Sequence, residues 1–348
     1  MRALYSGLKY NFYNSKKGGS FEYETFYSYF KRYFGSDITY LPFEDILSLG
    51  KQKYNKIVLE TIQKEKPDIF FSFMFTDELD FKTLDEIKKY TTSIAWFADD
   101  HWRFHNYSKY YAPYFSRVVT TYSKAVEWYK KAGIENIIHS QWAVDTDLYK
   151  PTKWTGEDKP PEVSFVGSWS RPRAKIIETL KKAGIPVSVY GKGWDGGHVS
   201  QEKMIEIFSH SKINLALNPA PDFLNTNSLG RLFFKRSLNK IVPDFHIIRN
   251  IEAFAHRGIS QIKARHFEIP ACGGFLMTSH ADDLENYYKP EEIVLYENID
   301  DFVRKIKFYL SHDKQRENIA HAGYERTIRD HTYKQRFEEI FKKIKNTA

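Results

Sequence analysis

The chain has 348 residues, a mass of 41.1 kDa and a formal net charge of +8 at neutral pH. This length fits two domains of ordinary size, and 42% hydrophobic with 28% charged residues argues against disorder. No stretch approaches the roughly 18 uncharged apolar residues that a transmembrane helix needs, and the N-terminus lacks the apolar core of a signal peptide.

The charge and the cysteine content bear on partners and compartment. Cys272 is the single cysteine, which excludes an internal disulfide and makes a reducing cytoplasm the expected location. A basic surface suits anionic partners such as nucleotide diphosphates, anionic membrane or nucleic acid; the alternative is a surface of solvated lysines. Because no dense run of Lys and Arg occurs, a nucleic-acid-binding arm is not expected.

In the first half of the chain, short apolar strands alternate with helical patterns. Strands are expected at 3–6, 38–41, 68–75, 93–98, 117–121 and 137–142. Helices are expected at 21–34, 46–65, 79–90 and 124–132. Gly133 follows two lysines, which is typical of a helix end.

The second half repeats this alternation after a polar stretch, 151–161, which we interpret as an interdomain linker. Strands are expected at 163–167, 187–190, 213–217, 275–278 and 293–295, and helices at 174–183, 201–209, 284–288 and 301–310. Residues 220–260 interrupt the alternation and are expected to form an insertion with its own helices. From Asp313 onward the tail is expected to be helical, with one apolar face packed against a domain.

Strand alternating with helix predicts an α/β protein of two doubly wound, Rossmann-like domains with parallel sheets covered on both faces. We expect an N-terminal, acceptor-side domain over 1–150 and a C-terminal, donor-side domain over 151–330 that carries the insertion at 220–260. A C-terminal helix over 331–348 follows. Ligands of such folds bind beyond the carboxyl ends of the strands, and a cleft is expected between the domains.

The loop after the strand at 163–167 is a first candidate site. It contains Gly167 and Ser168 and is followed by Arg171, Arg173 and Lys175. A helix begins near Pro172, and its backbone N–H groups favour an anion. The cations would neutralise a diphosphate; the alternative is a plain turn with solvated cations.

A second candidate is the glycine-rich run from Tyr190 to Gly197, which includes Gly191 and Lys192. Its glycines permit close approach by a ligand or by the other domain. It is not a dinucleotide fingerprint, because no acidic residue lies at the right distance.

A third candidate is the segment 261–278. Helical spacing places Arg265 and Glu268 on one face. Pro270 is expected to end the helix near Ile269, so that Glu268 lies in the last turn and opposes the helix dipole unless it is bound. A pair of ribose hydroxyls is a suitable partner for its carboxylate; the alternative is a surface ion pair of little energy.

The run from Lys263 to Thr278, Lys-Ala-Arg-His-Phe-Glu-Ile-Pro-Ala-Cys-Gly-Gly-Phe-Leu-Met-Thr, strongly resembles the signature of CgeB-like glycosyltransferases. These are related to the retaining glycosyltransferase group 4, which has the GT-B fold. The run Trp142-Ala-Val-Asp-Thr-Asp-Leu-Tyr-Lys-Pro is similar to the segment that closes the N-terminal domain in that group. Such a fold implies two domains that face each other across a cleft, with C-terminal helices returning toward the first domain.

The resemblance implies roles for individual residues. Glu268 matches the second acid of the Glu-x7-Glu pair, which binds the nucleotide ribose, whereas the first acid falls at Ser260. Arg171 and Lys175 fall near the family's Arg and Lys that neutralise the donor diphosphate, although their spacing is shorter than usual. The further donor-site residues that it implies are Lys263, Arg265, Gly273 and Gly274. Serine at 260 leaves the sugar and the stereochemical outcome open.

In the first domain, a strand ends in Asp99, Asp100 and His101. One aspartate is expected to act as general base toward an acceptor hydroxyl, and His101 to hold the sugar or share the proton; the alternatives are a helix N-cap and a packed histidine. Gly18 and Gly19 resemble the family's glycine-containing loop near donor and acceptor. No metal or other cofactor is expected, because GT-B enzymes as a class need none.

The sequence thus predicts a cytoplasmic enzyme that moves a sugar from a nucleotide-diphosphate donor to a glycan, protein or lipid-linked acceptor, with peripheral membrane contact as one option. One alternative is a GT-B-type sugar-nucleotide epimerase. Another is a catalytically degenerate, nucleotide-binding scaffold, in keeping with Ser260. A DNA-modifying glycosyltransferase is also compatible with the positive charge.

Overall fold

The computed structural model describes residues 1–223 and 225–345, and its chain forms two compact units. Among the described residues, the first unit comprises 1–141, 223–257 and 344–345, and the second comprises 142–222 and 258–343. The division therefore falls nearer to Gln141 than to the expected boundary at 150.

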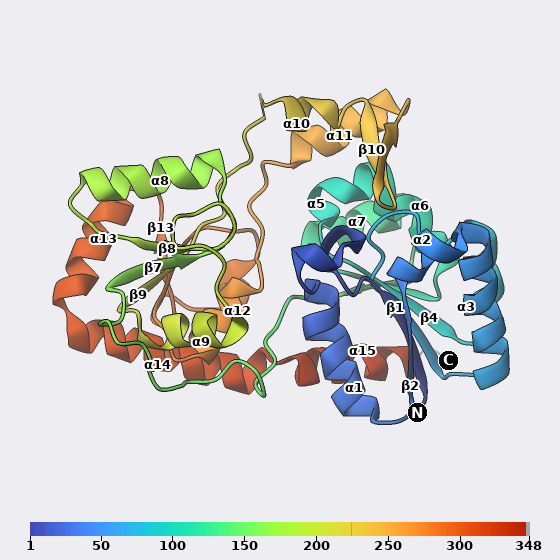
Figure 1. The fold of residues 1–348 in the computed structure, drawn as a ribbon, viewed down its shortest axis with the longest axis horizontal. Helices are drawn as coiled ribbons and strands as arrows, with labels where there is room; N and C mark the ends of the chain where they lie inside the picture. Colours follow the sequence, from blue (N-terminus) through green and yellow to red (C-terminus); the bar gives the residue numbers. More distant parts are fainter. Residues whose placement is uncertain (224, 346–348) are drawn as a thin grey trace. The chain divides into compact units, whose positions relative to one another are not determined.

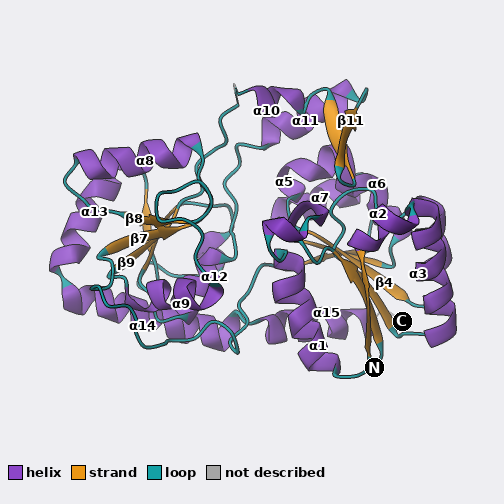
Figure 2. Cartoon of the chain, viewed as in Figure 1, coloured by secondary structure: helices purple, strands orange, loops and turns teal. Residues whose placement is uncertain are grey.

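The first unit is built on a parallel sheet of six strands in the order β2-β1-β3-β4-β5-β6, with helices packed on both faces (Figures 1 and 2). Its strands are β1 (Ala3–Gly7), β2 (Ile38–Pro42), β3 (Ile69–Ser72), β4 (Thr92–Phe97), β5 (Arg117–Thr120) and β6 (Ile137–His139). All six coincide with predicted strands. The inner strands β1, β3, β4 and β5 are apolar runs that a sheet covered on both faces buries almost completely, whereas the edge strands β2 and β6 are only partly buried.

The helices of this unit follow the prediction with two differences. They are α1 (Ser28–Phe34), which continues a π-helical segment (Glu22–Tyr27), then α2 (Ile46–Leu49), α3 (Lys51–Glu65), α4 (Phe81–Ile87), α5 (Asp100–Arg103), α6 (Lys109–Tyr111) and α7 (Ser123–Lys131). Gly50, with φ of 83°, separates α2 from α3 where one helix was predicted. The helical segment that follows β4 was not predicted.

The insertion belongs to the first unit, although the sequence placed it in the C-terminal domain. It forms α10 (Thr226–Gly230), a hairpin of β10 (Phe234–Ser237) and β11 (Lys240–Pro243), and α11 (Ile247–His256). Hydrogen bonds explain the attachment: Leu238 N donates to Thr76 Oγ1 at 3.1 Å, and Asn106 Nδ2 donates to Asn250 Oδ1 at 3.0 Å. Leu224, within the predicted insertion, lies outside the described residues.

The second unit has a parallel sheet of five strands in the order β13-β12-β9-β7-β8. The strands are β7 (Val163–Val166), β8 (Ser188–Tyr190), β9 (Ile213–Ala216), β12 (Leu276–Ser279) and β13 (Val294–Tyr296). The helices are α8 (Arg171–Lys182), α9 (Gln201–His210), α12 (Arg265–Ala271), α13 (Ile299–Ser311), α14 (Asp313–Asp330) and α15 (Tyr333–Lys345). The prediction of two doubly wound α/β domains is confirmed.

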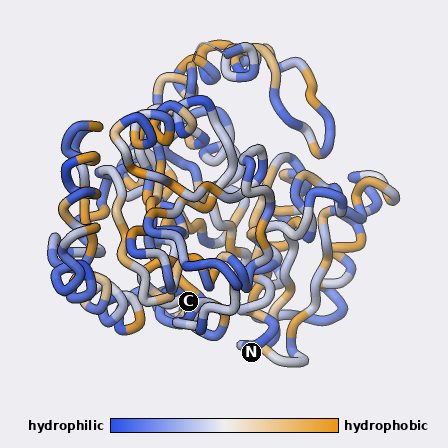
Figure 3. Tube along the Cα trace, turned by 60° about the vertical axis from the view of Figure 1, so that its left-hand side comes forward, coloured by the Kyte–Doolittle hydropathy of each residue, from blue (hydrophilic) through white to orange (hydrophobic). Residues whose placement is uncertain are grey.

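Apolar side chains of the strands and inward helix faces form the core of the second unit. Phe165, Leu215 and Met277 lie in neighbouring strands and pack against Leu180 and Phe302 from the helices. Figure 3 colours the Cα trace by hydropathy, and hydrophobic and hydrophilic residues alternate along its helical coils. This packing holds the carboxyl ends of the strands at one edge of the sheet.

The polar stretch 151–161 is part of the second unit and does not act as a free linker. Trp154 lies under the ammonium group of Lys203, 3.8 Å from ring centroid to Nζ, and Thr155 Oγ1 donates to Glu206 Oε1 at 2.6 Å. Both partners belong to α9. The interpretation from composition alone was wrong because two side chains within the stretch anchor it.

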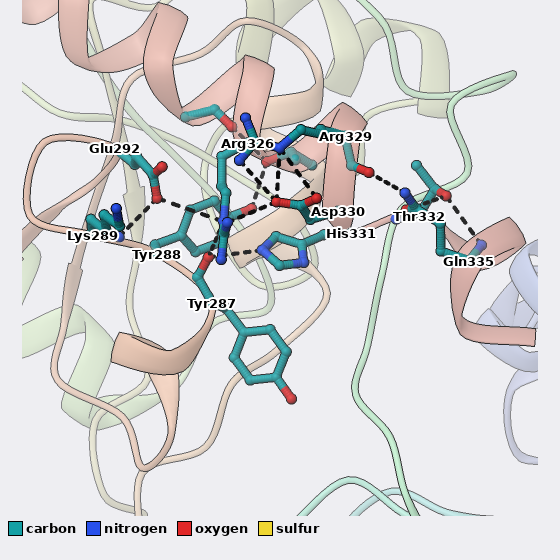
Figure 4. A network of polar contacts seen from close by, with 12 residues as sticks. Tyr287, Tyr288, Lys289, Glu292, Arg326, Arg329, Asp330, His331, Thr332 and Gln335 are labelled. Atoms are coloured by element: carbon teal, nitrogen blue, oxygen red, sulfur yellow. Dashed lines mark hydrogen bonds and ion pairs between the residues drawn. The ribbon is translucent and has the colours of Figure 1, made fainter. Parts of the chain in front are cut away.

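The C-terminal tail is helical, as predicted, but breaks between α14 and α15. At the end of α14, Arg326 pairs with Asp330 at 2.7 Å and donates through Nε to the Tyr287 carbonyl at 3.0 Å (Figure 4). His331 Nε2 lies 2.8 Å from the same carbonyl, and burial lowers the pKa of His331 to about 4. Residues 346–348 of the predicted C-terminal helix lie outside the described residues.

Candidate functional site

The loops after β7 and β8 lie side by side at the carboxyl edge of the second sheet. Trp169 N donates to the Lys192 carbonyl at 2.8 Å, and Trp194 Nε1 donates to the Gly167 carbonyl at 2.9 Å. Gly191 has φ of 119°, and a Cβ there would collide with the Gly167 carbonyl. The contact between the loops therefore explains Gly191, whereas a Cβ at Gly167 would collide with the ring of Phe165.

The start of α8 is capped and holds one arginine firmly. The Ser170 hydroxyl accepts from Arg173 N at 3.5 Å. The Arg173 side chain donates through Nε to the Leu217 carbonyl at 3.0 Å and through a terminal nitrogen to the Ser168 carbonyl at 2.8 Å. Arg173 thus joins the loops after β7 and β9 beside free N–H groups of a helix start, which is a favourable position for an anion.

The other predicted cations of this edge are less constrained. Arg171 has a side chain that is 70% exposed and lies 3.6 Å from Asp222 Oδ2. Lys175 and Lys192 are exposed, and Lys263 is half-buried. These side chains can reorient toward a ligand, whereas Arg173 is already held in place.

Glu268 lies in a buried cluster at the start of α12. Its carboxylate is 2% exposed and forms an ion pair with Arg265, whose side chain is 33% exposed. The buried Tyr149 hydroxyl is hydrogen-bonded to the same carboxylate, and desolvation and the charge of Glu268 raise the pKa of Tyr149. The predicted pair is therefore an internal one, with Arg265 as its partly exposed member.

Helix α12 begins at Arg265 and continues through Pro270 to Ala271. Glu268 therefore lies in its first turn. The expectation that Glu268 opposes the helix dipole was wrong, because the proline lies at the end of a short helix where few backbone bonds are lost. A carboxylate in the first turn interacts favourably with the positive end of the helix.

Arg173 and Arg265 lie close enough to repel one another. After desolvation, the charge of Arg265 is the cause that lowers the pKa of Arg173. Two neighbouring guanidinium groups at the ligand-binding edge of a doubly wound sheet are relieved by an anion between them.

Gly273 and Gly274 lie at the opposite edge of the sheet, because α12 runs back to the amino end of β12. Gly273 has φ of 73°, and a Cβ at Gly274 would collide with the Phe208 carbonyl. The structure corrects their predicted place near the donor: both are required by the turn from α12 into β12.

His266 was missed by the sequence reasoning. It is fully buried, with Nε2 3.1 Å from Thr278 Oγ1 and Nδ1 3.0 Å from the Lys263 carbonyl, and burial lowers its pKa to about 4. A neutral His266 therefore ties the start of α12 to β12. The one indication of His266 in the sequence is that it directly follows Arg265, which was predicted to lie in the donor site.

At the end of β4 in the first unit, the three predicted catalytic residues differ in environment. Asp100 is fully buried and accepts from Tyr129 Oη at 2.9 Å, and desolvation raises its pKa to about 6. His101 is 6% exposed and packs against the Tyr122 ring, with centroids 6.2 Å apart. Asp99 is half-buried. Of the two acids, Asp99 is therefore the more accessible one and Asp100 the buried one.

The insertion brings two arginines to the neighbourhood of Asp99. The guanidinium carbons of Arg231 and Arg257 lie 5.6 and 5.9 Å from the ring centroid of Trp102. Asp99 interacts electrostatically with Arg231, and desolvation and repulsion from Arg231 lower the pKa of Arg257 to about 10. The sequence did not reveal this cluster because its members are more than a hundred residues apart.

Gly18 and Gly19 follow the carboxyl end of β1, within a loop that closes on itself. Asn11 N donates to the Gly18 carbonyl at 3.1 Å, and Asn11 Nδ2 donates to the Gly19 carbonyl at 2.6 Å. Gly18 has φ of 79°, which favours glycine. The loop shares a sheet edge with Asp99.

Two kinds of feature are absent from the described part of the chain. Within residues 1–223 and 225–345, no group of three His, Cys, Asp or Glu side chains is arranged to hold a metal ion. In the same part of the chain, no helix has the length and apolar content to cross a membrane.

Comparison with known proteins decides the class. Residues 171–342 match a family described as Glycosyl transferase-like. The chain has the GT-B fold, and this half of it is a glycosyltransferase-like domain. The chain is 23% identical over 228 residues to the spore protein CgeB of Bacillus subtilis (strain 168), a match that covers 66% of each chain. The CgeB-like resemblance of the sequence is thereby confirmed.

Solved structures show the same fold. The Anabaena protein Alr3699/HepE in complex with UDP has a TM-score of 0.60 at 11% identity, covering 99% of this chain and 100% of that one. A glycosyltransferase from Rickettsia africae ESF-5 has a TM-score of 0.62 at 12% identity, covering 99% and 98%. The Anabaena protein was also solved with UDP-glucose.

Proposed function

We propose that this glycosyltransferase transfers a sugar from a nucleoside-diphosphate donor, with uridine as the first base to test, to an acceptor hydroxyl, and that it does so without a metal ion. The observation that carries the proposal is the pair Arg173 and Arg265 at the carboxyl edge of the second sheet, beside the start of α8. The UDP and UDP-glucose complexes of the Anabaena protein favour uridine.

In this mechanism the leaving diphosphate is stabilised electrostatically. Arg173 is held by two carbonyls and Arg265 by Glu268, so both positive charges are oriented before the donor binds. Groups that are oriented in advance stabilise developing charge at little cost in reorganisation. The exposed Arg171, Lys175 and Lys192 add positive charge around the same loops.

The role of Glu268 can be separated from that of the arginines. The resemblance assigns it to the ribose, whereas its ion pair supports a positioning role toward Arg265. In the first case Glu268→Gln weakens both uridine and UDP; in the second it weakens UDP and leaves uridine unchanged.

On the acceptor side we propose Asp99 as the general base, with His101 and the loop of Gly18 and Gly19 near it. A carboxylate can take the proton of an attacking hydroxyl when the two are within hydrogen-bonding reach. Asp99→Asn is expected to reduce transfer while UDP affinity is retained. The cytoplasm is the proposed compartment, since Cys272 is buried and is the single cysteine.

Arg173→Gln tests the donor site. The amide keeps a hydrogen-bond donor for the neighbouring carbonyls but removes the charge, and UDP affinity is expected to fall about tenfold or more by calorimetry, since charge-assisted bonds to phosphate are strong. Arg329→Ala is the matched control, because that arginine is 62% exposed at the end of α14. Equal UDP affinity in wild type and Arg173→Gln would overturn the donor site.

Product analysis with the donor alone separates transfer from the other functions. Rapid isomerisation or release of the sugar without an acceptor would point to an epimerase. Tight UDP binding with no turnover of UDP-, GDP- or TDP-sugars would point to a scaffold.

A further inference from the structure

Exposed apolar side chains are concentrated in the insertion, 223–257. Seven of the fifteen large hydrophobic residues that are exposed in the described part of the chain lie there. Phe245 is 87% exposed, Ile248 77% and Ile241 60%. A folded surface rarely gathers such side chains without a partner.

The exposed face of α11 is not the one that attaches it to the unit. Ile248 and Ile251 are three positions apart and share one side of the helix, and the exposed Phe245 lies just before its start. Asn250 and Ala253, on the other side, are 3% and 2% exposed, and Asn250 bonds to Asn106. The fold is thus complete without covering the isoleucines.

The two sides of the hairpin differ in their exposed side chains. Its register places Phe234 opposite Pro243 and Arg236 opposite Ile241, so the exposed Phe234 and Ile241 lie on one side together with the half-buried Arg236. Lys235 and Lys240 lie on the other side and are exposed. Long lysine side chains can reach around such an element to a charged layer.

The insertion also carries much of the positive charge. Residues 223–257 contain six Lys and Arg and two Asp and Glu, a net charge of +4 out of +8 for the whole chain. The four arginines lie over aromatic rings of the first unit, whereas Lys235 and Lys240 are exposed. Apolar side chains flanked by cations match the interface of an anionic bilayer, where each Lys or Arg adds about 1 kcal/mol and buried apolar area adds more. A second copy is a poorer occupant, because two such surfaces would meet with like charge.

We propose that the insertion 223–257 docks the protein onto anionic membrane, with Phe245, Ile248 and Ile251 in the lipid interface and Lys235 and Lys240 at the headgroups. This surface is independent of the donor site, and it would bring the enzyme to acceptors held at a membrane.

Vesicle co-sedimentation tests the proposal with the full chain. Vesicles of phosphatidylcholine mixed with an equal amount of phosphatidylglycerol are expected to bind the wild type, and binding should weaken with salt. Pure phosphatidylcholine is expected to bind far less. Both F245S/I248S and K235E/K240E are expected to lose binding to the mixed vesicles by about tenfold or more.

Phe308→Ser is the matched control, since Phe308 is 42% exposed on α13 and lies outside the insertion. Unchanged thermal denaturation of both double variants shows that they are folded, and their unchanged UDP affinity keeps this test separate from that of the donor site. No binding of the wild type to mixed vesicles overturns the proposal, as does equal binding by F245S/I248S. A dimer of the wild type that F245S/I248S abolishes, without vesicle binding, would assign the surface to a second copy.

Discussion

Asp100→Asn is expected to stabilise the protein at neutral pH. Burial raises the pKa of this carboxyl from the usual 3.8 to about 6, so the folded state is penalised for holding it ionised. A shift of about 2 units corresponds to ~3 kcal/mol. The asparagine carbonyl can still accept from Tyr129 Oη, which now donates to Asp100 at 2.9 Å.

The raised pKa of Asp100 also determines how the stability of the wild type depends on pH. Between pH 3.8 and about 6 the unfolded chain has lost the proton while the folded one keeps it, so this contribution to stability falls as the pH rises. Above about pH 6 the whole penalty is present. Asp100→Asn is therefore expected to exceed the wild type by up to ~3 kcal/mol at pH 7.5 and to match it near pH 4.

Thermal denaturation at the two pH values, together with a transfer assay, decides the role of Asp100. Asp100→Ala is the companion variant; it leaves the buried Tyr129 hydroxyl without this acceptor and is expected to be less stable than Asp100→Asn by ~1–3 kcal/mol. A lower Tm of Asp100→Asn at pH 7.5 would refute the reasoning. Loss of transfer at unchanged Tm would restore Asp100 to a catalytic role.

Three further outcomes are expected. Gly274→Ala should lower the free energy of unfolding by ~1–3 kcal/mol in thermal denaturation because there is no room for a Cβ, whereas Gly230→Ala, which has open space around it, should not. Gly191→Ala should weaken UDP binding in calorimetry by displacing the loop after β7, and unchanged affinity would contradict that. His331→Gln should reduce the loss of Tm between pH 7 and pH 4, because the neutral histidine has its pKa lowered to about 4 and must otherwise take up a proton on unfolding; equal pH dependence would speak against it.

The sequence predicted the two sheets well because each buried strand is an apolar run and each covering helix has an apolar face. Every predicted strand of both sheets is present. The same reasoning did not predict the elements of the insertion. Phe245 and Ile248 are apolar and resemble core residues in the sequence, although both are exposed in the structure.

The candidate site was predicted in part. The sequence cannot show that Asp100 is buried while its neighbour Asp99 is accessible. This difference depends on Tyr129, which comes from a distant helix and contacts Asp100. The family signature did locate Arg265 and Glu268, but their pairing with Tyr149 required the fold. The cluster around Trp102 depends wholly on the insertion.

The path of the chain has a consequence for assembly. The chain leaves the first unit after Gln141, returns at Phe223 to form the insertion, and leaves again after Arg257. During synthesis, Arg231 and Arg257, which lie against Trp102, therefore leave the ribosome only after the strands β7, β8 and β9 have emerged. Neither unit is a continuous fragment: cutting at residue 141 removes the insertion from the first, and a piece that begins at 258 lacks three of the five strands of the second. Dissection of this enzyme into separately folded halves would need a permuted or spliced chain rather than a simple truncation.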